Sequence, residues 1–468
     1  MRNPISGRAV FLTLTLVTVA GAHVGSPDVF FQGKAGPWPL LVTIRPPDVI
    51  PGVARIEIRS LAPGVKEIQL TPTPMTGEAS KHPPIADIAT ISQDDPRNFE
   101  GSLWLMGIGS WVVHIHATGD AGAGDMVVPV PALAAKMAPM PGGLGYFLVG
   151  MMVFLVAGMV AIVGAAVRES RLEPGAPGAR WTPRTFGAMG FTTVLLIFLL
   201  WAGNKWWASD AETFRGRLYK PLTIAATVNA TGHADFKLAD PGWLQLRKLD
   251  DLIPDHGHLM HLFLIRMPAM DQVFHLHPEQ TGTGFFSLNL PSLPAGTYKI
   301  FADLVHENGL DETAVGEAQL AEIHGQPLTG DDAGGAATAD LGNGYTMVWL
   351  RDGTEPVRAT QVAQFSFEIK GPGGTPVSDL EPYMGMGGHA EFVKRDASVF
   401  AHVHPTGSVS MASVAVASPA AMMAMHEARV GPTVSFPYGV PTVGQYRIFV
   451  QMKRAGKVET GAFDLDVK

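Results

Sequence analysis

Histidine side chains gather in two similar stretches of the chain. Residues 251–278 read DLIPDHGHLMHLFLIRMPAMDQVFHLHP, and residues 379–405 read DLEPYMGMGGHAEFVKRDASVFAHVHP. Both follow one skeleton, which is D-L-x-P, a short polar turn, one histidine, a β-rich run and H-x-H-P. Together they hold eight of the 16 histidines. Because imidazole is the commonest metal ligand in proteins, this duplicated pattern predicts a metal site in each copy.

The spacing of the histidines indicates where their side chains point. Alternate residues of an extended strand share a face, so the two histidines of each H-x-H project together. The upstream turn of the first copy adds three imidazoles, whereas the aligned positions of the second copy carry two thioethers and one imidazole. The predicted ligands are His256, His258, His261, His275 and His277 in the first copy, and Met384, Met386, His389, His402 and His404 in the second.

The two ligand sets differ in softness. Thioether is softer than imidazole, so the second copy is expected to favour Cu(I) and the first Cu(II) or Zn(II). Copper is the expected metal, with zinc as the alternative. Imidazole ligands usually need an outer hydrogen-bond acceptor, and Asp251, Asp255, Asp379 and Glu381 are close enough in sequence to supply it. The competing interpretation is that the histidines are surface residues kept by the duplication.

The N-terminus offers a second candidate site. Residues 1–22 combine two arginines, an apolar run and a small-residue end, which is typical of a secretory signal peptide. Cleavage at its end would leave His23 first, with its α-amine and ring free to bind one metal ion as a histidine brace. His114 and His116 could add further ligands from one strand face. Alternatively, His23 is only a flexible end and the pair faces solvent.

A third candidate lies near the C-terminus, in the segment AAMMAMHEA of residues 420–428. Met422, Met425 and His426, together with Met423, could capture Cu(I). The competing interpretation is a hydrophobic turn packed on a sandwich.

Patterns along the chain predict how these sites are carried. Residues 23–143 form short, often alternating β runs broken by Pro and Gly, which favours an immunoglobulin-like sandwich. Residues 144–167 and 186–207 are apolar enough for transmembrane helices. The loop between them, 168–185, carries four arginines, so it is expected to be cytoplasmic, with both flanking parts outside.

The duplicated stretches belong to larger units. We expect a first repeat domain at 208–325, a Gly- and Ala-rich linker at 326–340 and a second repeat domain at 341–468. The predicted fold class is therefore mainly β, with three immunoglobulin-like or cupredoxin-like β-sandwich domains and two transmembrane helices.

Amino-acid composition and charge exclude several classes of function. The chain has no cysteine, which excludes disulfides, a blue-copper thiolate and C-x-x-C redox chemistry. The formal charge of -8 is unsuited to nucleic acid. Because no nucleotide-binding loop, nucleophile elbow or H-E-x-x-H helix is present, no enzyme activity is predicted. A copper redox enzyme built on the His23 brace is the alternative.

The run HVGSPDVFFQGKAGPWPLLVTIRPPDVIPG, the two apolar segments and the second histidine stretch resemble uncharacterised bacterial membrane proteins with YtkA-like and FixH-like extracytoplasmic sandwiches. The resemblance implies membrane-anchored sandwiches associated with metal handling or respiratory-complex assembly, and it assigns no catalytic residue.

These observations together predict a bacterial inner-membrane protein whose chain lies mostly on the periplasmic side. Its expected function is to bind, buffer or deliver copper. In the alternative, the sandwiches are an interaction module that docks on a respiratory or metal-transport membrane complex.

Overall fold

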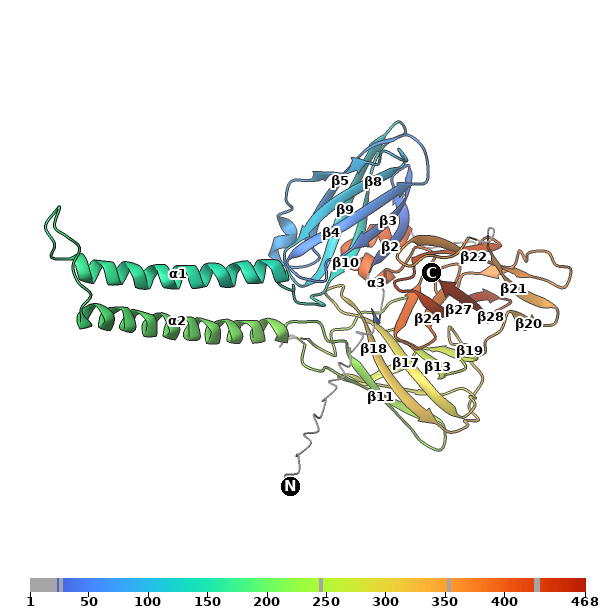
Figure 1. Cartoon of the computed structure of the whole chain (residues 1–468). Helices are drawn as coiled ribbons and strands as arrows, with labels where there is room; N and C mark the ends of the chain where they lie inside the picture. The colour runs from blue at the N-terminus through green and yellow to red at the C-terminus, as the bar shows by residue number, and fades with distance from the viewer. Residues whose placement is uncertain (1–22, 25–27, 244–246, 352–354, 425–429) are drawn as a thin grey trace, which may run out of the picture.

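Three β-rich bodies lie at one end of a long hairpin of two helices (Figure 1). The structure is a computed structural model that describes residues 23–24, 28–243, 247–351, 355–424 and 430–468. Strands predominate in all three bodies, and their sheets have a sandwich-like arrangement. The predicted fold class, mainly β with two apolar helices, is confirmed.

The N-terminal body is a sandwich of two sheets. The first sheet has the order β2 (Val29–Ala35), β3 (Trp38–Arg45), β4 (Gly52–Ser60), β8 (Asn98–Leu105) and β7 (Thr90–Ile91), and the second has the order β10 (Gly122–Ala132), β9 (Gly109–Gly119), β5 (Val65–Pro74) and β6 (Asp87–Ile88). A short 3-10 helix, η1 (Glu78–Lys81), follows β5. In β4 the side chains of Ala54, Ile56 and Ile58 alternate with exposed ones and enter the core. This period of two is what a half-buried strand requires.

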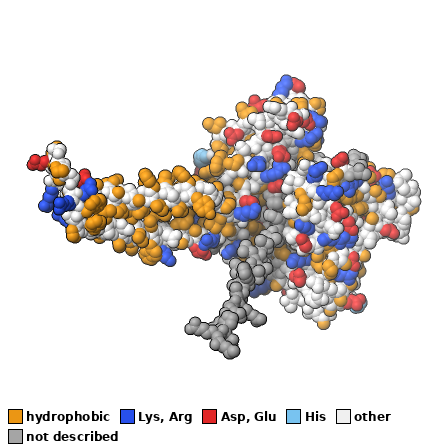
Figure 2. Space-filling view, viewed as in Figure 1, with side chains coloured by type: hydrophobic (Ala, Val, Ile, Leu, Met, Phe, Trp, Pro, Cys, Tyr) orange, Lys and Arg blue, Asp and Glu red, His pale blue; other side chains and the backbone are white. Residues whose placement is uncertain are grey.

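The hairpin consists of α1 (Gly142–Glu169) and α2 (Pro183–Gly216), both long and apolar enough to cross a membrane. Hydrophobic side chains cover its sides, and Lys and Arg gather at its far tip (Figure 2). The Thr182 hydroxyl accepts a hydrogen bond from the Thr185 N–H and Pro183 is the first helical residue, which are common helix-start signals. α2 runs past its predicted apolar end at residue 207, because the polar residues that follow are still compatible with a helix until Gly216.

The first repeat contains a nine-stranded sheet. Its order is β15 (Glu279–Gly282), β16 (Phe285–Asn289), β12 (His233–Ala239), β11 (Thr223–Val228), β18 (Asp311–Leu320), β17 (Gly296–Val305), β13 (His261–Met267), β14 (Gln272–Leu276) and β19 (Ala333–Ala336). β19 comes from the segment predicted as a linker and pairs with β14.

The second repeat has two sheets. One contains β1 (His23–Val24), β25 (Val399–Val403), β24 (His389–Lys394), β27 (Gly444–Arg454) and β23 (Leu380–Glu381), with β28 (Lys457–Val467) also on β27. The other has the order β20 (Asp340–Gly342), β21 (Tyr345–Leu350), β22 (Val362–Lys370) and β26 (Thr433–Gly439). The helices α3 (Met411–Ala417) and α4 (Pro419–Ala424) follow β25.

The duplication seen in the sequence recurs in the strand order. The order β18-β17-β13-β14 of the first repeat matches β28-β27-β24-β25 of the second. The registers match as well, since His261 lies opposite Asp303 and His389 lies opposite Gln451. Positions can therefore be equated one by one between the repeats.

The two repeats pack against each other through these matched sheets. Phe301 of the first repeat stacks on Phe400 of the second, with ring centroids 4.2 Å apart and planes 8° apart. Phe263 and Phe449 belong to the same buried cluster. The alternation of each strand places the H-x-H histidines on this inter-repeat face, whereas Leu276, between two of them, enters the core of the first repeat.

The N-terminal sandwich packs against the segment that follows the second H-x-H-P. The Gln32 N–H donates to the Thr406 carbonyl at 2.7 Å, and the Ser408 N–H donates to the Phe30 carbonyl at 2.9 Å. Val414 of α3 packs into the core of the N-terminal sandwich. The segment that follows the second H-x-H-P is thus held by that sandwich.

Candidate metal centre between the two repeats

Two matching hairpin turns begin the site. In the turns 255–258 and 383–386, the first and fourth residues exchange both backbone hydrogen bonds. The second residue has a positive φ, 49° at His256 and 50° at Met384, and the third residue of each turn is glycine, also with positive φ. Two successive residues with positive φ define the tight turn favoured in hairpins. The sequences D-H-G-H and Y-M-G-M therefore fold in the same way.

All eight histidines of the two stretches form one cluster. Imidazole rings of the first repeat lie against rings of the second, with the centroid of His256 at 5.3 Å from His389 and 5.2 Å from His404. His261 and His402 are 5.7 Å apart. The histidine cluster consists of His256, His258, His261, His275, His277, His389, His402 and His404. The predicted imidazoles thus share one inter-repeat site, where the sequence suggested a separate site in each copy.

Burial argues against the surface interpretation. His275 and His389 have no exposed surface, and His261 and His404 are each 2% exposed. Buried polar side chains are retained when they have partners or ligands. These four histidines are therefore not surface residues.

Three histidines of the first repeat form the first triad, which is His261, His275 and His277. One ring nitrogen from each lies within 4.8 Å of the others. The opposite nitrogen of each ring meets an acceptor. The pairs are His261 Nε2 with the Asp255 carbonyl at 3.1 Å, His275 Nδ1 with Gln451 Oε1 at 2.9 Å, and His277 Nδ1 with Asp332 Oδ1 at 2.9 Å. Such outer acceptors fix the tautomer and orientation of metal-binding imidazoles.

The acceptors determine which nitrogens carry lone pairs. With protons on the nitrogens that donate, His261 Nδ1 and His275 Nε2 present lone pairs to each other across 2.9 Å. His277 Nε2 meets no hydrogen-bond partner among the described residues. Nitrogens about 2.0–2.1 Å from one tetrahedral metal ion are separated by about 3.3 Å. The donor atoms and the spacing of the first triad therefore fit a metal ion.

The second triad takes ligands from both repeats: His256 from the first, and His389 and His404 from the second. The His404 Nδ1–H donates to the Val409 carbonyl at 3.1 Å, which leaves Nε2 as the donor atom. Neither nitrogen of His389 has a hydrogen-bond partner in the part of the chain that the structure describes. The second triad therefore also fits a metal ion, but only when the repeats are docked.

His402 lies between the triads. Its ring centroid is 5.5 Å from His275 and 5.2 Å from His389. Its Nδ1 is 3.3 Å from Asp303 Oδ2, and its Nε2 meets no other described polar atom. His402 thus lies beside a member of each triad.

Glu391 is a fully buried carboxyl beside the cluster, opposite His402 in the sheet. Its equivalent in the first repeat is Phe263, whose ring stacks on His275 at 4.3 Å. Burial, followed by the charge of Asp303, raises the pKa of Glu391 well above its usual range. Sequence reasoning missed this residue, because a single glutamate in a β run carries no signal of its own.

The electrostatics keep the imidazoles neutral. Burial lowers the pKa of His261, His275, His389 and His404 well below the ordinary value, and neighbouring imidazoles lower it further. Burial also lowers the pKa of His277, partly opposed by Asp332. Metal ligands must be deprotonated, so these side chains are held in the state that binds.

The two predicted thioether ligands, Met384 and Met386, are buried. Met384 packs with Ala333 and Tyr383 in a small apolar cluster, and Met386 is 3% exposed. His258 stacks on His277 at 3.8 Å and keeps a partly exposed side chain, 3.4 Å from Asp331.

The other predicted ligands lie elsewhere. His114 Nε2 is 3.0 Å from the Thr73 hydroxyl and His116 Nδ1 is 2.7 Å from Asp125, both in the N-terminal sandwich. The backbone of His23 pairs with Val399 on the edge of the second repeat. The predicted signal peptide, residues 1–22, lies outside the described residues.

The methionine-rich segment shows a packing role where it is described. Met422 packs partly against the N-terminal core, whereas Met423 is 75% exposed. Met425 and His426 lie outside the described residues. Of the described methionines of this segment, Met422 alone shows the packing expected of a hydrophobic turn on a sandwich.

The outer acceptors predicted from sequence proximity were mostly wrong. Asp255 serves through its backbone carbonyl, while its carboxylate accepts from the Ala412 N–H at 2.8 Å. The carboxylates of Asp251, Asp379 and Glu381 bond to His306, Arg454 and Gly456. The acceptors found, Gln451, Asp303 and Asp332, come from distant strands and from the predicted linker. The only available signal was that Asp303 and Gln451 occupy equivalent positions in the aligned repeats.

One protein-family model matches part of the chain. A family described as a domain of unknown function (DUF8832) matches residues 221–318 and 338–468, which are the two repeats. No curated protein matches the chain.

Three solved structures illustrate the weak structural similarities. A bacterial ice-binding adhesin is 6% identical, with 95% of this chain and 99% of that chain covered, at a TM-score of 0.16. E. coli alpha-2-macroglobulin is 10% identical, with 96% of this chain and 23% of that chain covered, at a TM-score of 0.19. A putative membrane anchored protein from Corynebacterium diphtheriae is 9% identical, with 94% of this chain and 96% of that chain covered, at a TM-score of 0.16. Scores at this level support no argument about fold or function.

Proposed function

We propose that the chain is a membrane-anchored metal-binding protein whose histidine cluster holds copper between the two repeats. The observation that carries the proposal is the first triad, in which each ring donates one N–H to a fixed acceptor and turns its other nitrogen toward a common point. The second triad adds a second position. We therefore expect up to two copper ions per chain.

The ligand chemistry favours copper over its competitors. Imidazole suits copper, zinc, iron and nickel, and Cu(II) binds most tightly among the divalent ions of the first transition row. The earlier expectation that the second repeat prefers Cu(I) depended on thioether donors. The imidazoles of both triads fit Cu(II), with zinc as the competitor. A thioether from Met384 or Met386 would shift the second triad toward Cu(I).

Burial bears on whether the ion is stored or passed on. His275 of the first triad and His389 of the second have no exposed surface. An ion bound by either residue would be shielded from a partner protein that had to exchange ligands with it. This favours a retained ion over rapid delivery. His258, whose side chain is 30% exposed, is the cluster member that a partner could reach most directly.

The proposed location is the bacterial inner membrane, with the repeats and the N-terminal sandwich on the periplasmic side. The apolar hairpin supports membrane anchoring, and the arginines between its helices support a cytoplasmic tip. A reporter fused to the C-terminal Lys468 should be exported, and one inserted at Pro174 in the tip should be cytoplasmic. A cytoplasmic C-terminus would rule out the proposed periplasmic location of the repeats.

The direct test is metal analysis of the full chain, purified in detergent, stripped with a chelator and reloaded with Cu(II). We expect up to two ions per chain, tightly held after gel filtration. His275→Ala should lower the copper content, whereas His233→Ala, at a partly exposed histidine on β12, should not. No retained copper in the unaltered chain, or equal content in both variants, would refute the proposal.

A further inference from the structure

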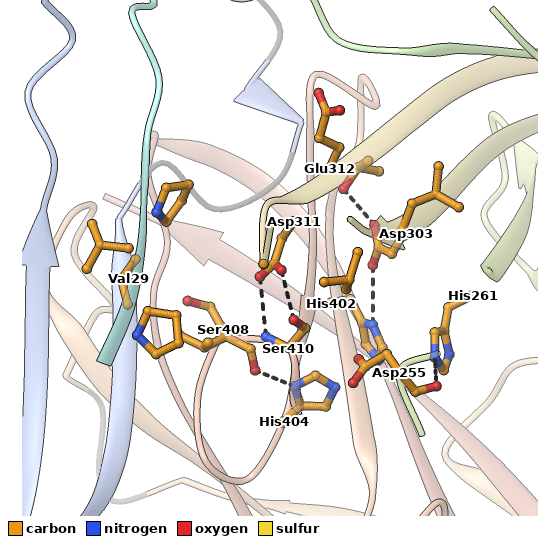
Figure 3. A pocket seen from close by; sticks show the side chains of 18 of the residues that line it. Val29, Asp255, His261, Asp303, Asp311, Glu312, His402, His404, Ser408 and Ser410 are labelled. Carbon is orange, nitrogen blue, oxygen red and sulfur yellow. Dashed lines mark hydrogen bonds and ion pairs between the residues drawn. The ribbon is translucent and has the colours of Figure 1, made fainter. Parts of the chain in front are cut away.

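A cavity of about 130 Å³ lies beside the histidine cluster, where the N-terminal sandwich and both repeats meet (Figure 3). Val29 and Leu133 line it from the N-terminal side, Asp303 and Asp311 from the first repeat, and His404 from the second. Because a water molecule occupies about 30 Å³ in the liquid, the space holds about four waters. Drug-sized ligands need about 300 Å³ or more, so the cavity is too small for a ligand of that size and suits water molecules and small ions.

The walls of the cavity are acidic. None of its described lining residues is Lys or Arg, and four are Asp or Glu. Glu312 is neutralised by Arg247 at 2.6 Å and His306 at 3.0 Å. The other three lining carboxylates are those of Asp255, Asp303 and Asp311.

Neutral hydroxyl groups hold two of these carboxylates in place. The Ser410 hydroxyl donates to Asp311 at 2.8 Å, and the Ser413 hydroxyl donates to the same carboxylate. The Thr313 hydroxyl donates to Asp303 at 2.6 Å. Burial raises the pKa of Asp311 to about 6, so this carboxyl is mostly ionised at neutral pH. Because hydroxyl donors orient a carboxylate without cancelling its charge, the acidic wall favours cations over anions.

The cavity reaches the metal-binding atoms. His402 and His404 both line it, and their Nε2 atoms are buried with no hydrogen-bond partner among the described residues. Asp303, whose carboxylate lies beside His402, keeps 24% of its side chain exposed. In Figure 3 the carboxylates of Asp303 and Asp311 lie near the two histidine rings. The cavity therefore brings a partly exposed carboxylate next to the buried imidazoles of His402 and His404.

We propose that this cavity is the entry route of the metal cation, which passes the carboxylates of Asp303 and Asp311 before the imidazoles of His402 and His404 bind it. The proposal rests on the proposed function and adds how the ion arrives. It also predicts that the cluster exchanges small hydrated cations and not anions. Since the N-terminal sandwich forms one wall, that sandwich controls access to a site whose ligands it does not supply.

The test is the rate of Cu(II) uptake by the metal-free full chain in detergent, followed by ligand-field absorption in a stopped-flow instrument. Asp311→Asn removes a charge from the wall, and Asp235→Asn, on the exposed side of β12, is its matched control. Leu133→Lys adds a positive charge to the wall, and Leu133→Met is its uncharged control of similar length. Final copper content is measured for every variant.

We expect Asp311→Asn and Leu133→Lys to slow uptake about tenfold, within the range of electrostatic effects on association rates, with unchanged final copper content. Both controls should load like the unaltered chain. Salt should slow uptake by the unaltered chain more than uptake by Asp311→Asn. If Asp311→Asn fails to fold, the comparison of Leu133→Lys with Leu133→Met tests the entry route by itself.

Equal uptake rates in all variants, with normal copper content, would overturn the entry route and leave the proposed function standing. If the unaltered chain takes up no copper, the function fails and the entry route fails with it. Full copper content in all proteins together with slower uptake in both control variants would also overturn the route, because the effect would not depend on the cavity's charge.

Discussion

The side-chain amide oxygen of Gln451 accepts a hydrogen bond of 2.9 Å from Nδ1 of His275, across the boundary between the two repeats. The relationship is reciprocal. Asp303, which occupies the position of Gln451 in the first repeat, lies 3.3 Å from Nδ1 of His402, which occupies the position of His275 in the second. Each repeat thus orients a histidine of the other, so the site depends on the docked pair.

The first prediction concerns this contact. Replacing Gln451 by Leu removes the acceptor that orients His275, and loss of such an outer partner typically costs 10–100-fold in metal affinity. We expect a Cu(II) affinity lower by about that factor in competition titrations with a chelator. Gln319→Leu, at an exposed position of β18, is the control. Unchanged affinity for Gln451→Leu would mean that His275 is not a ligand.

The second prediction concerns the composition of the triads. His256→Ala should abolish binding at the second triad while the first triad keeps its ion, because the two sets share no ligand. His277→Ala should have the complementary effect. Metal content and electron paramagnetic resonance would report one remaining copper with a different spectrum in each variant. Loss of both ions in each variant would indicate one shared site instead.

The third prediction concerns the pH dependence of copper binding. The lowered pKa values of His261, His275, His389 and His404 mean that protons compete for these rings only below the ordinary value of about 6.5. The folded chain should therefore keep Cu(II) at pH values where a peptide of residues 251–278 has already lost it. Affinity titrations at several pH values would check this. Parallel loss in the chain and the peptide would contradict it.

The same shifts affect the stability of the metal-free chain. Between the lowered folded pKa values and about 6.5, the unfolded chain binds more protons than the folded one. Stability should therefore fall as the pH drops through this window. Bound copper should suppress the fall, because it stabilises the folded state.

The fourth prediction concerns His306, which donates to Asp251 at 2.7 Å and to Glu312 at 3.0 Å. Burial lowers the pKa of His306, but the bonds to Glu312 and Asp251 outweigh it and raise the pKa overall. The folded chain thus binds the proton more tightly than the unfolded one. This contribution to stability is fully present below about pH 6.5 and is lost as the pH rises through the folded pKa.

His306→Gln should therefore destabilise the chain by about 1–3 kcal/mol at low pH and by less at high pH. Thermal melts of both proteins at several pH values would measure the difference, with His233→Gln as the control. A difference that grows with pH would show that His306 is neutral in the folded chain.

The fifth prediction concerns the packing of the repeats. Phe400→Ala removes the ring that stacks on Phe301 and should cost about 3–5 kcal/mol, as is usual for a buried phenylalanine. Copper affinity at the second triad should fall as well, since its ligands come from both repeats. Phe285→Ala, at a ring that is 46% exposed, is the control. Normal copper binding by a destabilised Phe400→Ala would show that docking is not needed.

The amino-acid sequence by itself determined the local structure of the site. The repeated D-L-x-P…H-x-H-P skeleton specified two copies of one strand pattern, and the period of a strand placed His275 and His277 on one face. The apolar stretches at 144–167 and 186–207 specified the helices, because length and lack of charge suffice for that. These features depend on residues that are close together in the chain, so the sequence alone can predict them.

Only the tertiary structure decided which residues meet. His256 joins His389 and His404 because the two repeats dock face to face through Phe301 and Phe400. The same docking brings Gln451 to His275 from 176 residues away, while the Met384 side chain packs with Tyr383 and Ala333. Strand periodicity fixes the face on which a side chain lies, but not what covers that face. The covering surface follows from the packing of whole sheets, which no local pattern encodes.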